Sequence, residues 1–195
     1  LQKRGAPDLA DAGTRLNSSW IFRWLEDPRH FRSDAAMPRV LRSAQERADV
    51  TSYLSRMHKA PDQDAKTKPK DNGLATSADY GQQLFARIGC AACHGEGGVL
   101  LTGVGSKFAE GQLASHLQDP LHGRPGTRMP DFALTADEAT ALAAFLSRDY
   151  RADFEPAPPA GDAVRGRVLI ASSGCAACHV IRDDNGAVAN TLNAP

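Results

Sequence analysis

The chain has 195 residues, enough for one or two domains, since a domain commonly contains roughly 100–150 residues. Its 23 Lys and Arg balance its 23 Asp and Glu, so no overall charge predicts binding to nucleic acid or to an acidic substrate. The sequence contains no apolar run of about 20 residues, and therefore no membrane span is predicted in it.

Residues 1–60 are the first predicted piece, and their pattern is helical. A helix is expected from about Ser19 to Glu26, followed by an Asp-Pro step and the dipeptide Met37-Pro38. Ser43-Ala44-Gln45-Glu46 is a capping box, in which a hydroxyl and a carboxylate satisfy the free amides at a helix start. A closing helix is therefore predicted after it. Residues 61–75, with Pro and several Lys and Asp, are predicted to be a polar linker.

Residues 76–150 repeat this pattern and extend it. Helical apolar spacing predicts a helix just before the pentapeptide Cys90-Ala91-Ala92-Cys93-His94. Met129-Pro130 then follows an Asp-Pro step at the spacing found in the first piece, and Thr135-Ala136-Asp137-Glu138 is a second capping box before a closing helix. This piece is predicted to be a complete module with a front half, which carries the cysteines, and a back half, which carries the methionine.

The chain ends with a second front half. A linker at residues 151–160 includes a Pro-rich stretch that is expected to be stiff. Residues 161–195 then contain a helical pattern and the pentapeptide Cys175-Ala176-Ala177-Cys178-His179, at the separation found in the complete module. They contain no methionine. No piece shows a convincing alternating strand pattern, so the predicted fold class is all-α.

The two pentapeptides predict covalent haem attachment. Two thiols separated by two residues can reach the two vinyl groups on one edge of a haem, and the adjacent histidine is then delivered to the iron. A zinc half-site is the first alternative, although zinc motifs usually place their second cysteine pair within roughly 20 residues. A redox disulfide is the second, and it gives the histidine no role. The predicted attachment residues are Cys90, Cys93, Cys175 and Cys178.

A haem that only carries electrons needs a second axial ligand. Methionine opposite histidine gives an electron-transfer site with a raised potential. Met129 precedes a proline and a closing helix, and Met37 repeats this setting, so both are predicted ligands rather than core side chains. Met57 lacks the setting and is predicted to lie in the core. His116, on a predicted helix, is an alternative to Met129.

In this order of parts the complete module resembles class I c-type cytochromes. The stretch from Trp20 to Pro38 is similar to cytochrome modules of modular bacterial oxidoreductases. The resemblance implies two cytochrome c-like helical domains with two covalently bound haems, with His94 and His179 as proximal iron ligands and Met129 as a distal one. The order of parts departs from that family, because the first piece has no attachment site and the last has no methionine.

The two incomplete pieces are predicted to form one domain. If the end of the chain at Pro195 is joined to its beginning at Leu1, the two pieces together form a whole module with its parts in family order. Each half alone would expose its haem-facing surface to water. At roughly 25 cal/mol per Å² of exposed apolar area, this exposure would cost several kcal/mol. We therefore expect Met37 to ligate the haem on Cys175 and Cys178, within one chain or by exchange of half-domains between chains. The alternative is a slice of a longer array.

The predicted function is electron transfer between redox partners, as a dihaem shuttle or as the electron-transfer portion of a larger oxidoreductase. A dihaem peroxidase and a haem sensor are the rival functions, and both need an open iron. Because haem is attached to thiols after export, the predicted location is the periplasm or an equivalent space.

Five arginines crowd the Met37 segment. They are interpreted either as a solvated face, with some arginines pairing haem propionates, or as a basic rim that steers an acidic redox partner. These residues are Arg23, Arg29, Arg32, Arg39 and Arg42.

Overall fold

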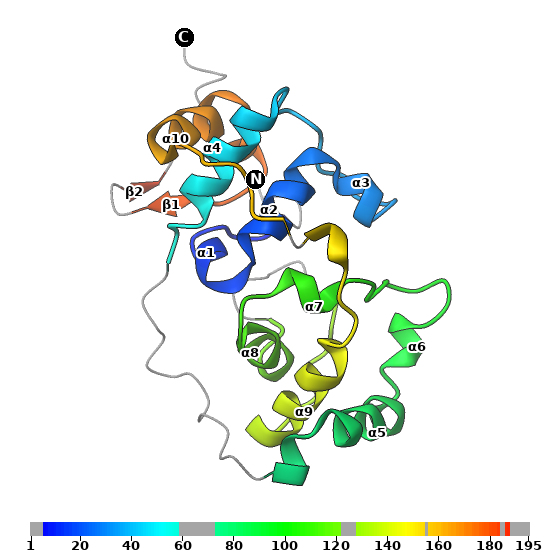
Figure 1. Cartoon of the computed structure of the whole chain (residues 1–195). Coiled ribbons are helices and arrows are strands. Elements are labelled where there is room, and N and C mark those ends of the chain that lie inside the picture. The colour runs from blue at the N-terminus through cyan, green and yellow to red at the C-terminus, as the bar shows by residue number, and fades with distance from the viewer. Residues whose placement is uncertain (1–5, 59–72, 122–127, 155, 184–185, 188–195) are drawn as a thin grey trace. The chain divides into compact units, whose positions relative to one another are not determined.

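The computed structural model describes residues 6–58, 73–121, 128–154, 156–183 and 186–187 (Figure 1). The chain divides into two compact units. Unit 1 joins an N-terminal segment, residues 6–58, to a C-terminal segment, which begins at Phe154 and includes residues 156–183 and 186–187. Unit 2 contains residues 73–121 and 128–153.

The described residues are mostly helical, in agreement with the predicted all-α class. Their only strands are β1 (Arg182–Asp183) and β2 (Gly186–Ala187), a two-residue antiparallel pair that the sequence did not predict. None of the helices in the described part of the chain is both long and apolar enough to cross a membrane.

Unit 2 is built on two packed helices, α5 and α9. Ser77 caps α5 by accepting a hydrogen bond from the Tyr80 amide, and the predicted capping box of Thr135 and Glu138 starts α9. Leu84 from α5 and Leu142 from α9 are almost fully buried between them. The elements are η1 (Gly73–Thr76), α5 (Ala78–Ile88), α6 (Ala91–His94), α7 (Val104–Lys107), α8 (Gln112–Gln118) and α9 (Ala136–Leu146).

Unit 1 is built on α4 and α10, which lie side by side although they come from opposite ends of the chain (Figure 1). The N-terminal segment contains α1 (Ala12–Arg15), α2 (Ser18–Glu26), α3 (Pro28–Phe31) and α4 (Ala44–Leu54). The C-terminal segment contains α10 (Ala163–Ser172), η3 (Cys175–Ala177), β1 and β2. The short helix η2 (Ala152–Phe154) ends at Phe154, the first residue of this segment.

The two segments of unit 1 share one hydrophobic core. Val50 and Leu54 from α4 and Ile21 from α2 are buried with Ile170 and Ile181 of the C-terminal segment. The predicted helix near residue 19 is confirmed as α2, and the predicted capping box is confirmed at the start of α4.

The predicted linkers differ in how far the structure describes them. Phe154, within the predicted linker 151–160, is buried, with its ring centroid 4.9 Å from that of Phe31. The linker therefore begins with an anchored side chain rather than with free chain. Most of the predicted linker 61–75 lies outside the described residues.

The same close contact between helices occurs in both units. A Cβ at Gly81 of α5 would collide with the carbonyl oxygen of Ala141 in α9, and one at Gly166 of α10 would collide with that of Asp49 in α4. Glycine at these two positions lets the helix backbones approach closely. The back halves correspond at an offset of 92 residues, as from Asp49 to Ala141, and the front halves at an offset of 85, as from Gly81 to Gly166.

Candidate functional site

In unit 2 the first pentapeptide follows directly on α5. Gly89 adopts the left-handed conformation, with φ of 82°, and this ends the helix and turns the chain into α6. Cys90 is partly buried and Cys93 is exposed. Burial, opposed by a backbone hydrogen bond, raises the pKa of the Cys90 thiol above its usual value.

In unit 1 the second pentapeptide follows α10 in the same way. Gly174, with φ of 83°, leads into η3. Cys175 packs against the core, and its burial raises the pKa of its thiol, whereas Cys178 is exposed. All four cysteines of the chain are unpaired, and in each pentapeptide the first is the more buried.

Both pentapeptide histidines make an equivalent contact. His94 Nδ1 lies 2.9 Å from the carbonyl oxygen of Val99, and His179 Nδ1 lies 2.9 Å from that of Pro7. A carbonyl can only accept, so Nδ1 carries the proton in each ring and the lone pair of the neutral imidazole is on Nε2. That tautomer is the one an Nε2-bound metal requires.

The partner of His179 comes from the other end of the chain. Pro7 and His179 are 172 residues apart, whereas Val99 follows His94 by 5 residues. Pro7 stands 92 residues before Val99, the offset at which the back halves of the two units correspond. The N-terminal segment thus provides unit 1 with the loop contact that unit 2 takes from its own continuous chain.

The two candidate methionine ligands each pack against the core of one unit. Met37 is partly buried in unit 1, and the indole Nε1 of Trp24 donates a hydrogen bond to its sulfur over 3.0 Å. Trp20 stacks on Trp24 with 5.0 Å between ring centroids. Met129 is partly buried against the core of unit 2.

The structure therefore brings Met37 and Cys175 to the core of unit 1. It brings Met129 to the core of unit 2, which also contains side chains of α5, the helix just before Cys90. Met57 is 5% exposed and lies in the core of unit 1, as predicted. The ring of His116 stacks on Phe108 at 5.7 Å. The two chain ends, Leu1 and Pro195, which the predicted single domain would bring close together, lie outside the described residues.

The arginines near Met37 are partly neutralised by nearby carboxylates. Arg23 pairs with Glu26 at 3.0 Å, Arg32 with Asp34 at 2.8 Å, and Arg39 lies 3.9 Å from Asp27. The Arg29 guanidinium donates to the carbonyl of Ala35. The face is therefore one of mixed charge rather than a uniform basic rim.

The donor set fits a covalently bound haem. Each unit offers two thiols, an imidazole with its lone pair on Nε2, and a methionine sulfur that a hydrophobic core holds in place. In the described part of the chain, no three His, Cys, Asp or Glu side chains gather in a way that could hold a metal ion. The zinc interpretation has no such cluster to support it.

Sequence reasoning missed the partners of these groups. The repeat offset contained the signal for Pro7, since it pairs Pro7 with Val99. The contact itself joins residues 172 positions apart, so it is visible only in the folded chain. The bond from Trp24 to the Met37 sulfur has no sequence signal beyond the presence of an indole on a nearby helix.

The comparison with family models gave a match over unit 2. Residues 76–146 match the family model described as "Cytochrome C oxidase, cbb3-type, subunit III". The match supports a class I c-type cytochrome, with covalently bound c-type haem and a general role in electron transfer to redox partners. Cytochrome c domains of this kind are typically exported or periplasmic. No curated protein and no solved structure matches the chain.

Proposed function

We propose that the chain is a dihaem c-type cytochrome that transfers electrons between redox partners, as a shuttle or as the electron-transfer portion of a larger oxidoreductase. One haem would be attached to Cys90 and Cys93 and the other to Cys175 and Cys178. When bound, haem supplies the redox change, because its iron alternates between the ferrous and ferric states. The protein supplies the thiols, the axial ligands and the apolar surroundings that set the potential.

The repeated histidine contact carries the proposal. A family match covers unit 2, and unit 1 has a Cys-x-x-Cys-His motif whose histidine Nδ1 meets a carbonyl at the same 2.9 Å. The carbonyls belong to Val99 and Pro7, which correspond at the repeat offset. The equivalence of the two histidines supports the same cofactor in both units.

We assign His94 and Met129 to the first iron and His179 and Met37 to the second. The carbonyl partner holds each imidazole in the tautomer that leaves Nε2 available, and such a partner also makes the ligand more basic. In unit 1 the indole of Trp24 donates to the Met37 sulfur, which orients this thioether and draws electron density from it.

In this proposal unit 1 is a cytochrome module whose back half precedes its front half in the sequence. The shared core supports it, because Ile170 and Ile181 of the C-terminal segment are buried with side chains of the N-terminal segment. Separated from its partner, either segment would expose this core to water. The two segments of a module could also be exchanged between neighbouring chains, and native mass spectrometry at several concentrations measures that exchange.

Redox partners are expected to dock on the protein surface near the haems. Because carboxylates lie within 4 Å of three of the five arginines near Met37, these arginines would steer an acidic partner less than an uncompensated basic rim would. A weak dependence of the association rate on ionic strength is therefore expected. The periplasm or an equivalent exported space is the proposed location, since attachment of haem to thiols takes place there.

Methionine substitutions test the proposal. Met37→Ala and Met129→Ala should each remove about half of the optical band that arises from sulfur bound to iron, and each should lower the potential of one haem. Met57→Ala is the control, because this buried side chain is outside the proposed ligand sets and its removal should leave the band intact. A pyridine haemochrome assay should give two haems per chain.

Two results would contradict the assignment. An unchanged band in Met37→Ala would show that another group, or none, lies opposite His179. A high-spin, five-coordinate component in the unaltered protein would favour a peroxidase or a sensor, since both need an open iron position.

A further inference from the structure

The chain contains two front helices, α5 and α10, and two back helices, α4 and α9, that pack by the same rule. In each observed pair a glycine of the front helix meets a backbone carbonyl of the back helix. The Cβ atoms of Phe145 and Tyr53 flank Gly81 and Gly166 in equivalent positions. Backbone shape alone would therefore allow either front helix to accept either back helix.

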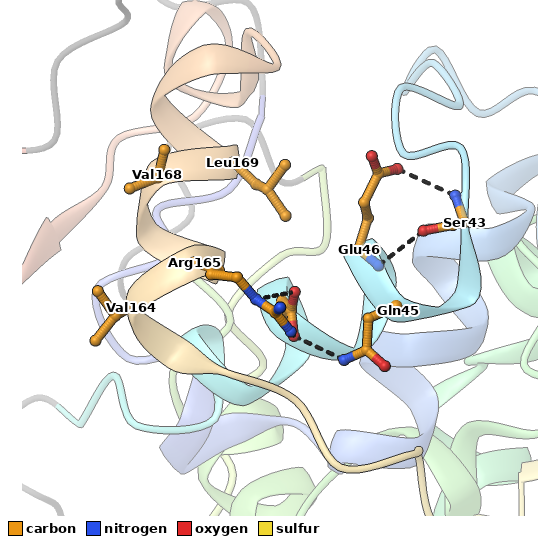
Figure 2. A pocket seen from close by; sticks show the side chains of 8 residues that line it. Ser43, Gln45, Glu46, Val164, Arg165, Val168 and Leu169 are labelled. Atoms are coloured by element: carbon orange, nitrogen blue, oxygen red, sulfur yellow. Dashed lines mark hydrogen bonds and ion pairs between the residues drawn. The ribbon is translucent and has the colours of Figure 1, made fainter.

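Asp49 distinguishes α4 from α9. Its side chain is 4% exposed, and it accepts hydrogen bonds from the Asp162 amide at 2.7 Å and from Gln45 Nε2 at 2.9 Å. The Arg165 guanidinium completes the set at 3.0 and 3.1 Å. Figure 2 shows Arg165 and Leu169 directed from α10 toward α4, and Val164 and Val168 on the other side of α10.

Tyr53, one helical turn after Asp49, makes a second polar contact with the C-terminal segment. Its hydroxyl donates to Asp183 Oδ2 over 2.7 Å, and Arg167 Nε donates to the same oxygen over 2.7 Å. Asp183 lies in β1, so the short hairpin holds the acceptor for both groups.

Unit 2 has none of these side chains at the corresponding positions. At the repeat offsets, Asp49 becomes Ala141 and Tyr53 becomes Phe145, and both belong to an apolar contact with α5. The C-terminal segment's partners change as well, since Arg165 becomes Tyr80, whose ring packs on the core of unit 2. The polar contacts are therefore specific to the junction of the N-terminal and C-terminal segments.

We propose that Asp49 and Tyr53 are recognition residues that direct the N-terminal segment to the C-terminal segment and prevent its pairing with α5. If α4 packed on α5, the Asp49 carboxylate would be buried beside Tyr80 without the arginine. The carboxylate would keep Gln45 of its own helix but lose its cationic partner, which is strongly destabilising for a buried charge, whereas against α10 the charge is satisfied. The inference rests on the proposed equivalence of the two units, but it does not require haem.

The direct test places the carboxylate on the other back helix of the full chain. Ala141→Asp gives α9 the side chain of α4, and Ala141→Asn adds the same bulk without the charge. Peptide-resolved hydrogen exchange measures the protection of α5 and α9. Protection is expected to fall at least about tenfold further in Ala141→Asp than in Ala141→Asn. Adding Tyr80→Arg to Ala141→Asp should restore part of that loss.

Two outcomes of this test would overturn the inference. One is equal protection in Ala141→Asp and Ala141→Asn, which would mean that the carboxylate does not discriminate against α5. The other is a Tyr80→Arg substitution that gives no recovery. The peptides of α4 and α10 serve as an internal control, because neither substitution lies in unit 1.

A second measurement keeps the inference testable if Ala141→Asp prevents unit 2 from folding. Asp49→Asn, Arg165→Gln and the double variant form a cycle in unit 1, which urea unfolding follows through tryptophan emission. The chain has two tryptophans, Trp20 and Trp24, and both lie in unit 1. Each single variant should raise the equilibrium constant for unfolding of unit 1 by some factor. The double variant should raise it by less than the product of those two factors, and a factor equal to the product would overturn the inference. Neither readout uses haem ligation, so failure of the haem assignment would remain distinguishable.

Discussion

Units 1 and 2 reach equivalent contacts through different chain orders. In unit 2 the front helix α5 precedes the back helix α9, and their contact is apolar. In unit 1 the back helix α4 comes first and α10 follows after the whole of unit 2. The connection from Leu54 to Ala163 is a little more than twice as long as the connection from Ile88 to Ala136. Because each doubling of a loop's length costs only about 0.6 kcal/mol of closure free energy, the longer connection is a small penalty.

Chain order is therefore a minor energetic term, and in our proposal side-chain contacts decide which segments pair. The apolar contact around Gly166 would hold α10 and α4 together, as the contact around Gly81 holds α5 and α9. Unit 1 adds polar contacts at Asp49 and Tyr53 that unit 2 lacks. Substitutions at matched positions separate what the units share from what only unit 1 has.

The largest effect is expected where the units are most alike. Gly166→Ala and Gly81→Ala each place a methyl group against a backbone carbonyl that cannot move without shifting a helix. Each should lower the free energy of unfolding of its own unit by about 3 kcal/mol. Urea unfolding followed by tryptophan emission should detect the first, and hydrogen exchange in α5 and α9 the second.

The two glycine substitutions also control for each other. Gly166→Ala should leave protection in α5 and α9 unchanged, and Gly81→Ala should leave the tryptophan transition unchanged. If one of the two is tolerated, the close approach of the helices is not shared, and the equivalence of the units is wrong.

The next effect is specific to unit 1 and depends on pH. Burial opposes ionisation of Asp49, but hydrogen bonds from Asp162, Gln45 and Arg165 outweigh it, so the pKa of this carboxyl lies below its usual value. A lowered pKa contributes stability that is present above the unfolded pKa of about 3.9 and is lost as the pH falls through the folded pKa.

Asp49→Asn should therefore destabilise unit 1 at neutral pH and make its stability less sensitive to pH below about 4. Urea midpoints from tryptophan emission at pH 7 and pH 3 measure both effects. Asp34→Asn is the matched control, since Asp34 is an exposed carboxylate of unit 1 whose partner Arg32 is also exposed. An acid sensitivity that Asp49→Asn leaves unchanged would place the titrating group elsewhere.

These contacts show where sequence reasoning succeeds and where it stops. The capping boxes and the helix before each pentapeptide are local patterns, and the structure contains them where they were predicted. The thiols and histidines of the candidate site are also fixed by local spacing. The bonds from Asp49 to Asp162 and from Tyr53 to Asp183 join residues 113 and 130 positions apart. No periodicity encodes such pairs, so they require the packed structure.

A smaller and equal effect is expected at the two capping boxes. The Ser43 hydroxyl accepts from the Glu46 amide at the start of α4, and Thr135 and Glu138 repeat this contact at α9. Ser43→Ala and Thr135→Ala should each cost about 1 kcal/mol, because one helix amide loses its partner. Tryptophan emission and hydrogen exchange in α9 measure the two losses. A loss confined to one unit would show that the boxes are not equivalent.

The smallest effect is expected at an ion pair that only unit 2 has. Arg148 lies 3.0 Å from Asp79, with 57% and 79% of the two side chains exposed, whereas the corresponding positions in unit 1 are Arg56 and the exposed Val164. Because water and salt screen such a pair, Arg148→Ala should lower the free energy of unfolding of unit 2 by less than about 0.5 kcal/mol. Hydrogen exchange in α5 and α9 at low and high salt measures the change. In the Asp49–Arg165 pair the arginine is 60% exposed but the carboxylate only 4%, so loss of Asp49 should cost more and depend less on salt. Equal losses at the two pairs would mean that burial gives the Asp49 contact no advantage, and the distinction between the units would then rest on their apolar contacts alone.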